Sequence, residues 1–242
     1  DGIMGLVFRT PATSKNVNNL VSANLLVAAF QKKNLRIIQR AAQRGAFVIP
    51  AIDGVGNPII SMSGRTKRHI QYANDLIDKF LVFEITERSL KDLKKQYADS
   101  YESISELAVA DQLEYHALTI TKQAPYLYSQ KQFLNALESV TLEDVNRIHK
   151  EILESSFIDL YAHGNYNSGQ IIDFTKSVRN KIGATSQITP WLYENEFEVK
   201  VGRGLVKKLR MPKDGVGIID SYIYPEKSLK TEAQFMIINK IF

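Results

Sequence analysis

The 242-residue sequence contains no cysteine. This absence excludes disulfide bonds, a cysteine nucleophile and metal sites made of thiolates, and it leaves the redox compartment open. No apolar run approaches the ~18 residues that a membrane-spanning helix needs, so we expect no membrane partner. The first residues, DGIMGLVFRT, lack both an initiator methionine and the charged-then-apolar pattern of a signal peptide. They are typical of the middle of a strand, and we expect the chain to be part of a longer one.

The sequence also lacks the histidine spacing of a catalytic zinc site. Such a site usually takes two histidines three or four residues apart on one helix face. The four histidines, His69, His116, His149 and His163, are much farther apart, and neither H-E-x-x-H nor H-x-x-E-H occurs. We interpret the first three as ordinary surface or boundary histidines of helices. The sequence therefore predicts no metal site and no catalytic residue in this chain.

The composition is that of a globular protein. Hydrophobic residues make up 44% of the chain and charged residues 24%. The net charge of +5 is mildly basic and allows weak contact with polyanions. No recognition helix, zinc finger or aromatic stacking pattern accompanies this charge, so we expect no specific nucleic-acid partner.

Strand and helix patterns alternate along the chain. Residues 3–10 favour a strand, and helical stripes follow at 16–31 and 34–44. Two apolar stretches on either side of Asp53-Gly54-Val55-Gly56 predict a hairpin. Residues 66–155 then predict a series of helices, including one over 106–122, and SFIDLYAH at 156–163 alternates like a strand. The residues alone therefore predict an α+β protein.

Two helix starts carry specific capping signals. Thr86 is expected to cap one helix, with Ile85 and Leu90 placed as a hydrophobic staple. Thr141 with Asp144 forms a capping box for a second helix. These signals fix where the two helices begin.

The segment YAHGN at 161–165 follows the last predicted strand. A histidine at a strand end can be a metal ligand or a general base, and it can equally belong to a turn. No partner nucleophile or second histidine lies near it in the sequence, so we interpret His163, Gly164 and Asn165 as a structural turn. In this interpretation the His163 ring bonds to nearby backbone, Gly164 takes an unusual φ, and Asn165 ties the turn to the next helix.

The last fifty residues carry a basic cluster after a polar linker at 186–195. Its members are Lys200, Arg203, Lys207, Lys208, Arg210 and Lys213. They could be edge-strand charges that discourage aggregation, or they could attract an acidic peptide or another polyanion. The strand ending at a proline and the helix that follows it near the C-terminus echo the first thirty residues, so we expect a second, similar domain to begin at 196.

Several strings resemble the pitrilysin/insulinase family. They are IPAIDGVGNPIISMSG at 49–64, FEITERSLKDLKKQYADSY at 83–101, LESVTLEDVNRIHKEILESSFIDLYAHGNYNSGQ at 137–170 and EAQFMIINKIF at 232–242. In that family, helices opening with VTL and turns containing HGN stand in the same order. The resemblance covers nearly the whole chain.

The resemblance implies an antiparallel sheet covered by helices, with the beginning of a second similar domain. Residues 1–185 would be a third-domain-like unit and 196–242 the start of a fourth. Members of the family are zinc metallopeptidases whose four domains close around peptide substrates, and the zinc motif lies in the first domain. The zinc of the parent protein would therefore be bound outside this chain, and no catalytic residue is carried over to it.

The implied function is a substrate-enclosing, non-catalytic portion of a zinc metalloendopeptidase. Its partners would be peptide substrates and the N-terminal catalytic half of the same protein, and self-association through the C-terminal helix at 228–242 is a further expectation. Two alternatives remain: an inactive relative that acts as a scaffold or processing partner, and a stand-alone polyanion-binding module. A bacterial pitrilysin would be periplasmic; otherwise we expect a cytoplasmic protein.

Overall fold

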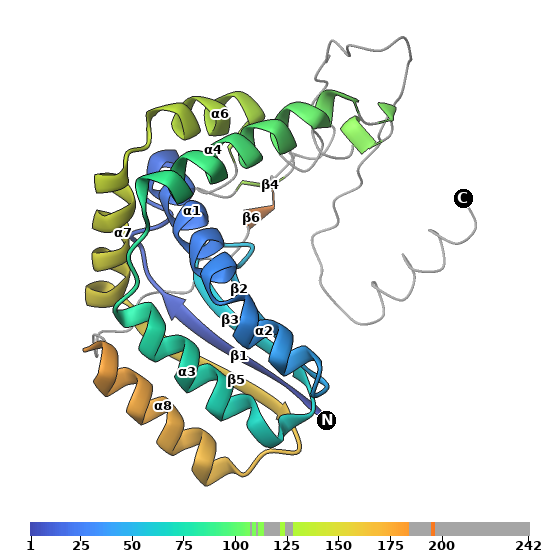
Figure 1. The fold of residues 1–242 in the computed structure, drawn as a ribbon, viewed down its shortest axis with the longest axis vertical. Coiled ribbons are helices and arrows are strands. Elements are labelled where there is room, and N and C mark those ends of the chain that lie inside the picture. The colour runs from blue at the N-terminus through green and yellow to red at the C-terminus, as the bar shows by residue number, and fades with distance from the viewer. Residues whose placement is uncertain (107, 110, 114–121, 124–127, 184–194, 197–242) are drawn as a thin grey trace, which may run out of the picture.

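The structure is a computed structural model that describes residues 1–106, 108–109, 111–113, 122–123, 128–183 and 195–196. Its elements are shown in Figure 1. The predicted linker, the basic cluster and the predicted second domain lie outside the described residues, apart from Asn195 and Glu196. The same is true of most of the helix predicted over 106–122.

A four-stranded sheet organises the described residues. Its strands are β1 (Gly2–Arg9), β2 (Ala46–Ile52), β3 (Pro58–Gly64) and β5 (Phe157–Gly164). The spatial order is β2-β3-β1-β5, and every neighbouring pair is antiparallel. The first strand of the chain therefore lies inside the sheet, and the last of the four strands forms one edge. Pro50 lies in β2, the other edge strand, where a missing N–H is tolerated.

Seven α-helices accompany the sheet in the described part of the chain. They are α1 (Val17–Lys33), α2 (Leu35–Ala42), α3 (His69–Leu81), α4 (Glu87–Glu102), α6 (Gln130–Ser139), α7 (Leu142–Ser155) and α8 (Ser168–Ile182). Short 3-10 turns, Thr66–Arg68 and Ser103–Glu106, precede α3 and follow α4. In Figure 1, α3 and α8 lie side by side at one end, while α4, α6 and α7 surround the start of α1 at the other.

One face of the sheet forms the hydrophobic core with the helices. Successive strand residues point to opposite faces, so Met4, Leu6 and Phe8 of β1 share the inner face. These three side chains are at most 2% exposed and belong to one cluster with residues of α1, α3, α7 and α8. Within it the Phe30 ring meets Phe80 edge-on, with ring centroids 5.2 Å apart. The helices therefore cover the inner face.

The predicted caps are confirmed. The Thr86 side chain accepts a hydrogen bond from the backbone N–H of Ser89, and Ile85 and Leu90 are both buried. Thr141 and Asp144 form the predicted capping box, in which the Thr141 N–H and hydroxyl both donate to one carboxylate oxygen. These bonds lower the pKa of the Asp144 carboxyl because they stabilise its charged form.

The predicted fold class, an antiparallel sheet covered by helices, is confirmed. One local prediction is wrong: Lys122, placed at the end of a helix, begins β4 (Lys122–Gln123), which pairs with β6 (Asn195–Glu196). This pairing joins segments distant in the sequence, which local periodicity does not show. Among the described residues, no helix has the length and apolar character needed to cross a membrane.

Candidate functional site

The turn at His163, Gly164 and Asn165 closes one end of the sheet. Gly164 has a φ of 118°, and a Cβ atom added to it would lie 2.5 Å from the carbonyl oxygen of Asp1. Both observations require a glycine at this position. The Asn165 N–H donates to the same Asp1 oxygen at 3.3 Å, and the Thr66 hydroxyl donates to the Asn165 carbonyl at 2.9 Å. The backbone of the turn therefore joins the first strand to the start of α3.

The side chains of the turn differ from the sequence interpretation. The His163 ring is exposed and makes no hydrogen bond to any described residue, so the predicted ring-to-backbone bond is wrong. The reason is the strand register: His163 pairs with Ile3, whose side chain is also exposed, and both point away from the core. Asn167, two residues beyond Asn165, caps α8 by accepting a hydrogen bond from the Gln170 N–H.

The outer face of the sheet, opposite the helices, is the candidate functional surface of the described residues. We call it the open face. Its members are the alternate strand residues Ile3, Gly5, Val7 and Arg9 of β1, Phe47, Ile49 and Ala51 of β2, Ile59, Ser61 and Ser63 of β3, and Phe157, Asp159, Tyr161 and His163 of β5. None of them belongs to the core cluster.

Large apolar side chains on the open face are exposed to solvent. The exposed fractions are 54% for Ile3, 57% for Phe47, 50% for Ile49 and 60% for Tyr161. Isolated exposed apolar residues are common on protein surfaces, but these four lie on one face of one sheet, and a gathered set of this kind marks an interaction surface.

In the strand register, small residues lie between these large apolar side chains. Ser61 lies between Ile49 of β2 and Gly5 of β1, and Gly5 lies opposite Tyr161 of β5. In the next row Ser63 separates Phe47 from Ile3. Neighbouring strands are about 4.8 Å apart, so the apolar side chains of the outer strands flank a lower strip of serine and glycine.

A charged pair orders the other end of the open face. The Arg9 guanidinium lies 3.0 Å from the Asp159 carboxylate and 4.9 Å from the centroid of the Phe157 ring. An arginine held by both a carboxylate and an aromatic face keeps a fixed position. The open face therefore has an apolar end at Phe47 and Ile3 and a charged end at Arg9.

Two histidines, His69 and His149, are buried, so their interpretation as surface or boundary residues is wrong. His69 is fully buried, and its Nδ1 lies 2.7 Å from the Tyr166 hydroxyl. His149 lies edge-on to the Phe80 ring, with centroids 4.7 Å apart. Burial lowers the pKa of both histidines and raises the pKa of Tyr166, so all three side chains are neutral near pH 7. The third, His116, lies outside the described residues.

These buried histidines do not form a metal site. The Nε2 atom of each ring is buried and has no hydrogen-bond partner in the described structure. A histidine that serves as a metal ligand would show the same feature when no metal is present. However, no three histidine, cysteine, aspartate or glutamate side chains gather closely enough to hold an ion anywhere in the described residues. A zinc ion needs three or four protein ligands, so the described side chains do not fit a zinc site.

The predicted substrate or polyanion contacts, Lys200, Arg203, Lys207, Lys208 and Arg210, lie outside the described residues and stay a prediction. The open face, by contrast, was not predicted as a surface. Alternation in AFVIPAI and SFIDLYAH indicates that each strand has two faces, but both faces carry apolar residues. Only the strand order shows that Phe47, Ile3 and Tyr161 share one side.

Comparison with known proteins identifies the fold. A scan of the sequence against protein-family models finds no match. The chain is 24% identical to insulin-degrading enzyme of Drosophila melanogaster over 127 residues, which are 52% of this chain and 12% of that protein. The structure superposes on crystalline pitrilysin with a TM-score of 0.69 and 20% identity, covering 76% of this chain and 19% of pitrilysin.

A protease from Helicobacter pylori is a further structural neighbour. Its TM-score is 0.59 at 13% identity, and the match covers 81% of this chain and 49% of that one. The chain thus spans about an eighth of its curated relative and between a fifth and a half of these two solved structures. The described residues have the fold of a domain of pitrilysin and the insulinase-type peptidases, as the sequence resemblance predicted.

Proposed function

We propose that this chain is a non-catalytic portion of a pitrilysin/insulinase-type zinc metalloendopeptidase, where it encloses peptide substrates. The fold supports a peptidase parent, and the described residues offer no ligand set for zinc. The catalytic zinc would be held by another part of the parent protein. The work of this portion is then to bind and confine the peptide while the catalytic half cleaves it.

The observation that carries the proposal is the open face. A sheet face in a closed domain normally packs against another layer, because exposed apolar surface is unfavourable in water. Here Phe47, Ile49 and Tyr161 are half exposed or more, while Met4, Leu6 and Phe8 on the opposite face are buried under the helices. A surface of this kind suits an extended peptide, whose apolar side chains can pack between the flanking residues.

The arrangement also suits binding without sequence specificity. The strip of Ser61, Ser63 and Gly5 leaves room for side chains of different sizes. Contacts of this type hold a peptide weakly and in several registers. Such behaviour is useful in a wall that confines a substrate and would be unhelpful in a selective receptor.

A matched pair of variants tests the proposal. Ile49 on the open face and Ile172 on α8 are 50% and 53% exposed, so Ile49→Thr and Ile172→Thr remove similar exposed apolar surface. Binding of a fluorescent, unstructured hydrophobic peptide to the 242-residue chain should weaken about fivefold in Ile49→Thr and stay within about twofold of the native value in Ile172→Thr.

Amide chemical shifts measured during the same titration locate the peptide. Changes concentrated in β1, β2 and β3 at the open-face residues agree with the proposal. Equal loss of binding in both variants, or shifts confined to the helices, would show that the open face does not bind peptide. The proposal would also fail if the gene encoding this chain carried no zinc-binding peptidase motif elsewhere in its reading frame.

A further inference from the structure

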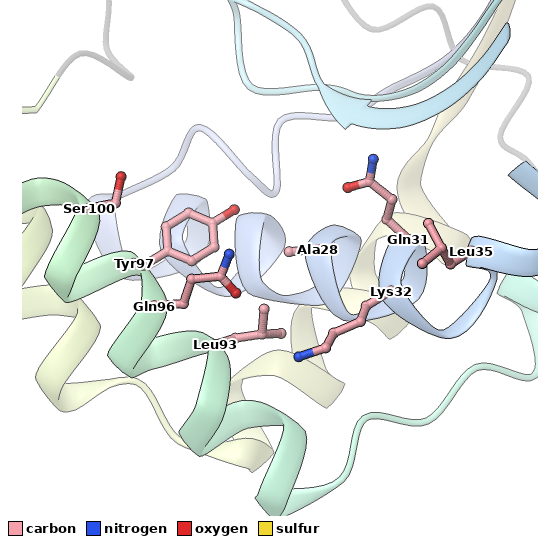
Figure 2. A pocket seen from close by; sticks show the side chains of 8 residues that line it. All are labelled: Ala28, Gln31, Lys32, Leu35, Leu93, Gln96, Tyr97 and Ser100. Carbon is pink, nitrogen blue, oxygen red and sulfur yellow. The ribbon is translucent and has the colours of Figure 1, made fainter. Parts of the chain in front are cut away.

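A groove lies on the helical side of the molecule, between the end of α1, the start of α2 and the middle of α4. Its volume is about 420 Å³. Figure 2 shows Leu93 and Tyr97 of α4 facing Ala28 of α1, with Lys32 and Leu35 toward one end. Leu35 is 47% exposed, so the groove offers apolar surface to solvent beside a cation. A groove of this size can take one or two side chains of a partner.

A column of arginines extends from this groove along α2. Arg36 and Arg40 lie four residues apart in the helix, and Arg44 follows one turn later, just beyond its end. We call these three residues the arginine column. All three are exposed, and none makes an ion pair with a described residue. The column therefore presents three cations in a row.

The helix itself does not explain this column. Like charges four residues apart repel each other, and Arg36 stands in the first turn, where the helix dipole favours an acidic residue. Some cations elsewhere in the fold are paired: Arg147 lies 2.8 Å from Glu151 on α7, and Lys181 lies 2.6 Å from Asp78. The column lacks such partners within the described residues.

The sequence around α2 is poor in acidic residues, although α4 on the other side of the groove carries Asp92 and Asp99. Asp53 is the sole acidic residue between Gly2 and Asn74, and it bonds to Val55 and Asn57 in the β2–β3 turn. A long stretch with cations and almost no anions produces a positive field over α2. A complementary partner must therefore bring negative charge.

We propose that the arginine column and the groove together bind an acidic segment of a protein partner. Residues four apart on a helix are separated by about 6 Å along its axis, so the partner would present carboxylates at about this spacing. Arginine favours carboxylates because its planar guanidinium can form two parallel hydrogen bonds. An apolar side chain of the same segment would enter the groove beside Leu35.

The groove favours a protein segment over a phosphate polymer. A polyphosphate or nucleic-acid backbone satisfies arginines equally well but has no aliphatic side chain to bury against Leu35, Leu93 and Ala28. The site is separate from the open face, because α2 buries Ala41 in the core cluster and belongs to the helical layer. The inference therefore does not rest on the proposed peptidase role.

Binding of a synthetic peptide to the 242-residue chain tests the inference. The peptide has a glutamate at every fourth position and one leucine beside them, and its affinity is measured by fluorescence anisotropy at an ionic strength of about 0.15 M. The double variant Arg36→Gln/Arg40→Gln should weaken binding about tenfold or more. Replacing the peptide's leucine by alanine should weaken binding to the native chain about fivefold.

The matched control is Lys176→Gln/Arg179→Gln, which removes two exposed cations from α8. It should leave the affinity within about twofold of the native value. The inference is overturned if both double variants lose affinity equally, or if the alanine peptide binds as tightly as the leucine peptide. It is also overturned if inorganic polyphosphate of the same charge competes as well as the peptide does. Circular dichroism confirms that each variant is folded.

Discussion

The two faces of the central sheet are built from the same four strands and have opposite environments. On β1, Leu6 is fully buried against the helices, while Ile3 on the other face is 54% exposed. Both are aliphatic residues in one strand, so residue type does not separate them. Position in the alternation decides which residue stabilises the fold and which is available for contact with another molecule. Variants of the two faces should therefore separate stability from binding.

The largest expected effect comes from the inner face. Leu6→Ala should lower the free energy of unfolding by about 2–5 kcal/mol, because it leaves a cavity in a packed core. Ile3→Ala, three residues away on the open face, should cost about 1 kcal/mol or less. Urea denaturation of both variants measures the difference. Equal losses would mean that the outer face is covered as well as the inner one.

The next effect concerns the turn at His163 and Gly164, at the end of β5. Gly164→Ala forces a Cβ atom into Asp1 at an unfavourable φ and should cost about 2 kcal/mol or more. His163→Ala changes an exposed ring without hydrogen bonds in the described structure and should cost less than about 0.5 kcal/mol. Thermal unfolding of the two variants measures the difference. A larger loss of stability in His163→Ala than in Gly164→Ala would contradict this prediction.

A smaller effect is the pH dependence of stability that the buried side chain of His149 produces. Burial lowers the pKa of His149 in the folded protein below its unfolded value near 6.5, so the unfolded state binds the proton more readily. Above about pH 6.5 the imidazole is neutral in both states, and His149 does not change the stability. As the pH falls below about 6.5, the free energy of unfolding decreases by at most about 1.4 kcal/mol per pH unit.

His149→Gln should flatten this slope below about pH 6.5. Buried His69 would supply the slope that remains, because its pKa is lowered in the same direction. Urea titrations at a series of pH values give the slopes directly. A slope that survives intact in His149→Gln would show that this imidazole charges freely in the folded state.

The smallest expected effect is that of added zinc, because we expect neither face of the sheet to bind it. After incubation with zinc and dialysis, elemental analysis of the 242-residue chain should find far less than one equivalent, and the chain alone should cleave no peptide. One retained equivalent that disappears when any one histidine is mutated would place a metal site within this chain.

Local features of the fold were predictable because local chemistry determines them. Thr86 and Thr141 cap their helices through bonds that span three residues, and the turn around Asp53 follows from its glycines. The burial of His149 was also visible in principle: Val145, Ile148, His149 and Ile152 occupy one helical stripe and are all buried.

The open face and the arginine column could not be predicted in the same way. The open face depends on the strand order β2-β3-β1-β5, which places Phe47 and Tyr161 on one surface although they are far apart in the sequence. The arginine column depends on which face of α2 packs against the core through Ala41. A signal for the column did exist, since residues 2–52 contain no aspartate or glutamate.

The internal position of β1 has a consequence for how the chain folds. Its partner β3 follows after two α-helices, but its other partner, β5, is separated from β3 by four more α-helices of the described chain. Closing so long a loop is entropically costly and makes pairing of β1 with β5 a late event. Until then one edge of β1 has unpaired backbone groups, which can pair with strands of other molecules. We therefore expect that rapid packing of helices against the sheet limits such pairing while the chain folds.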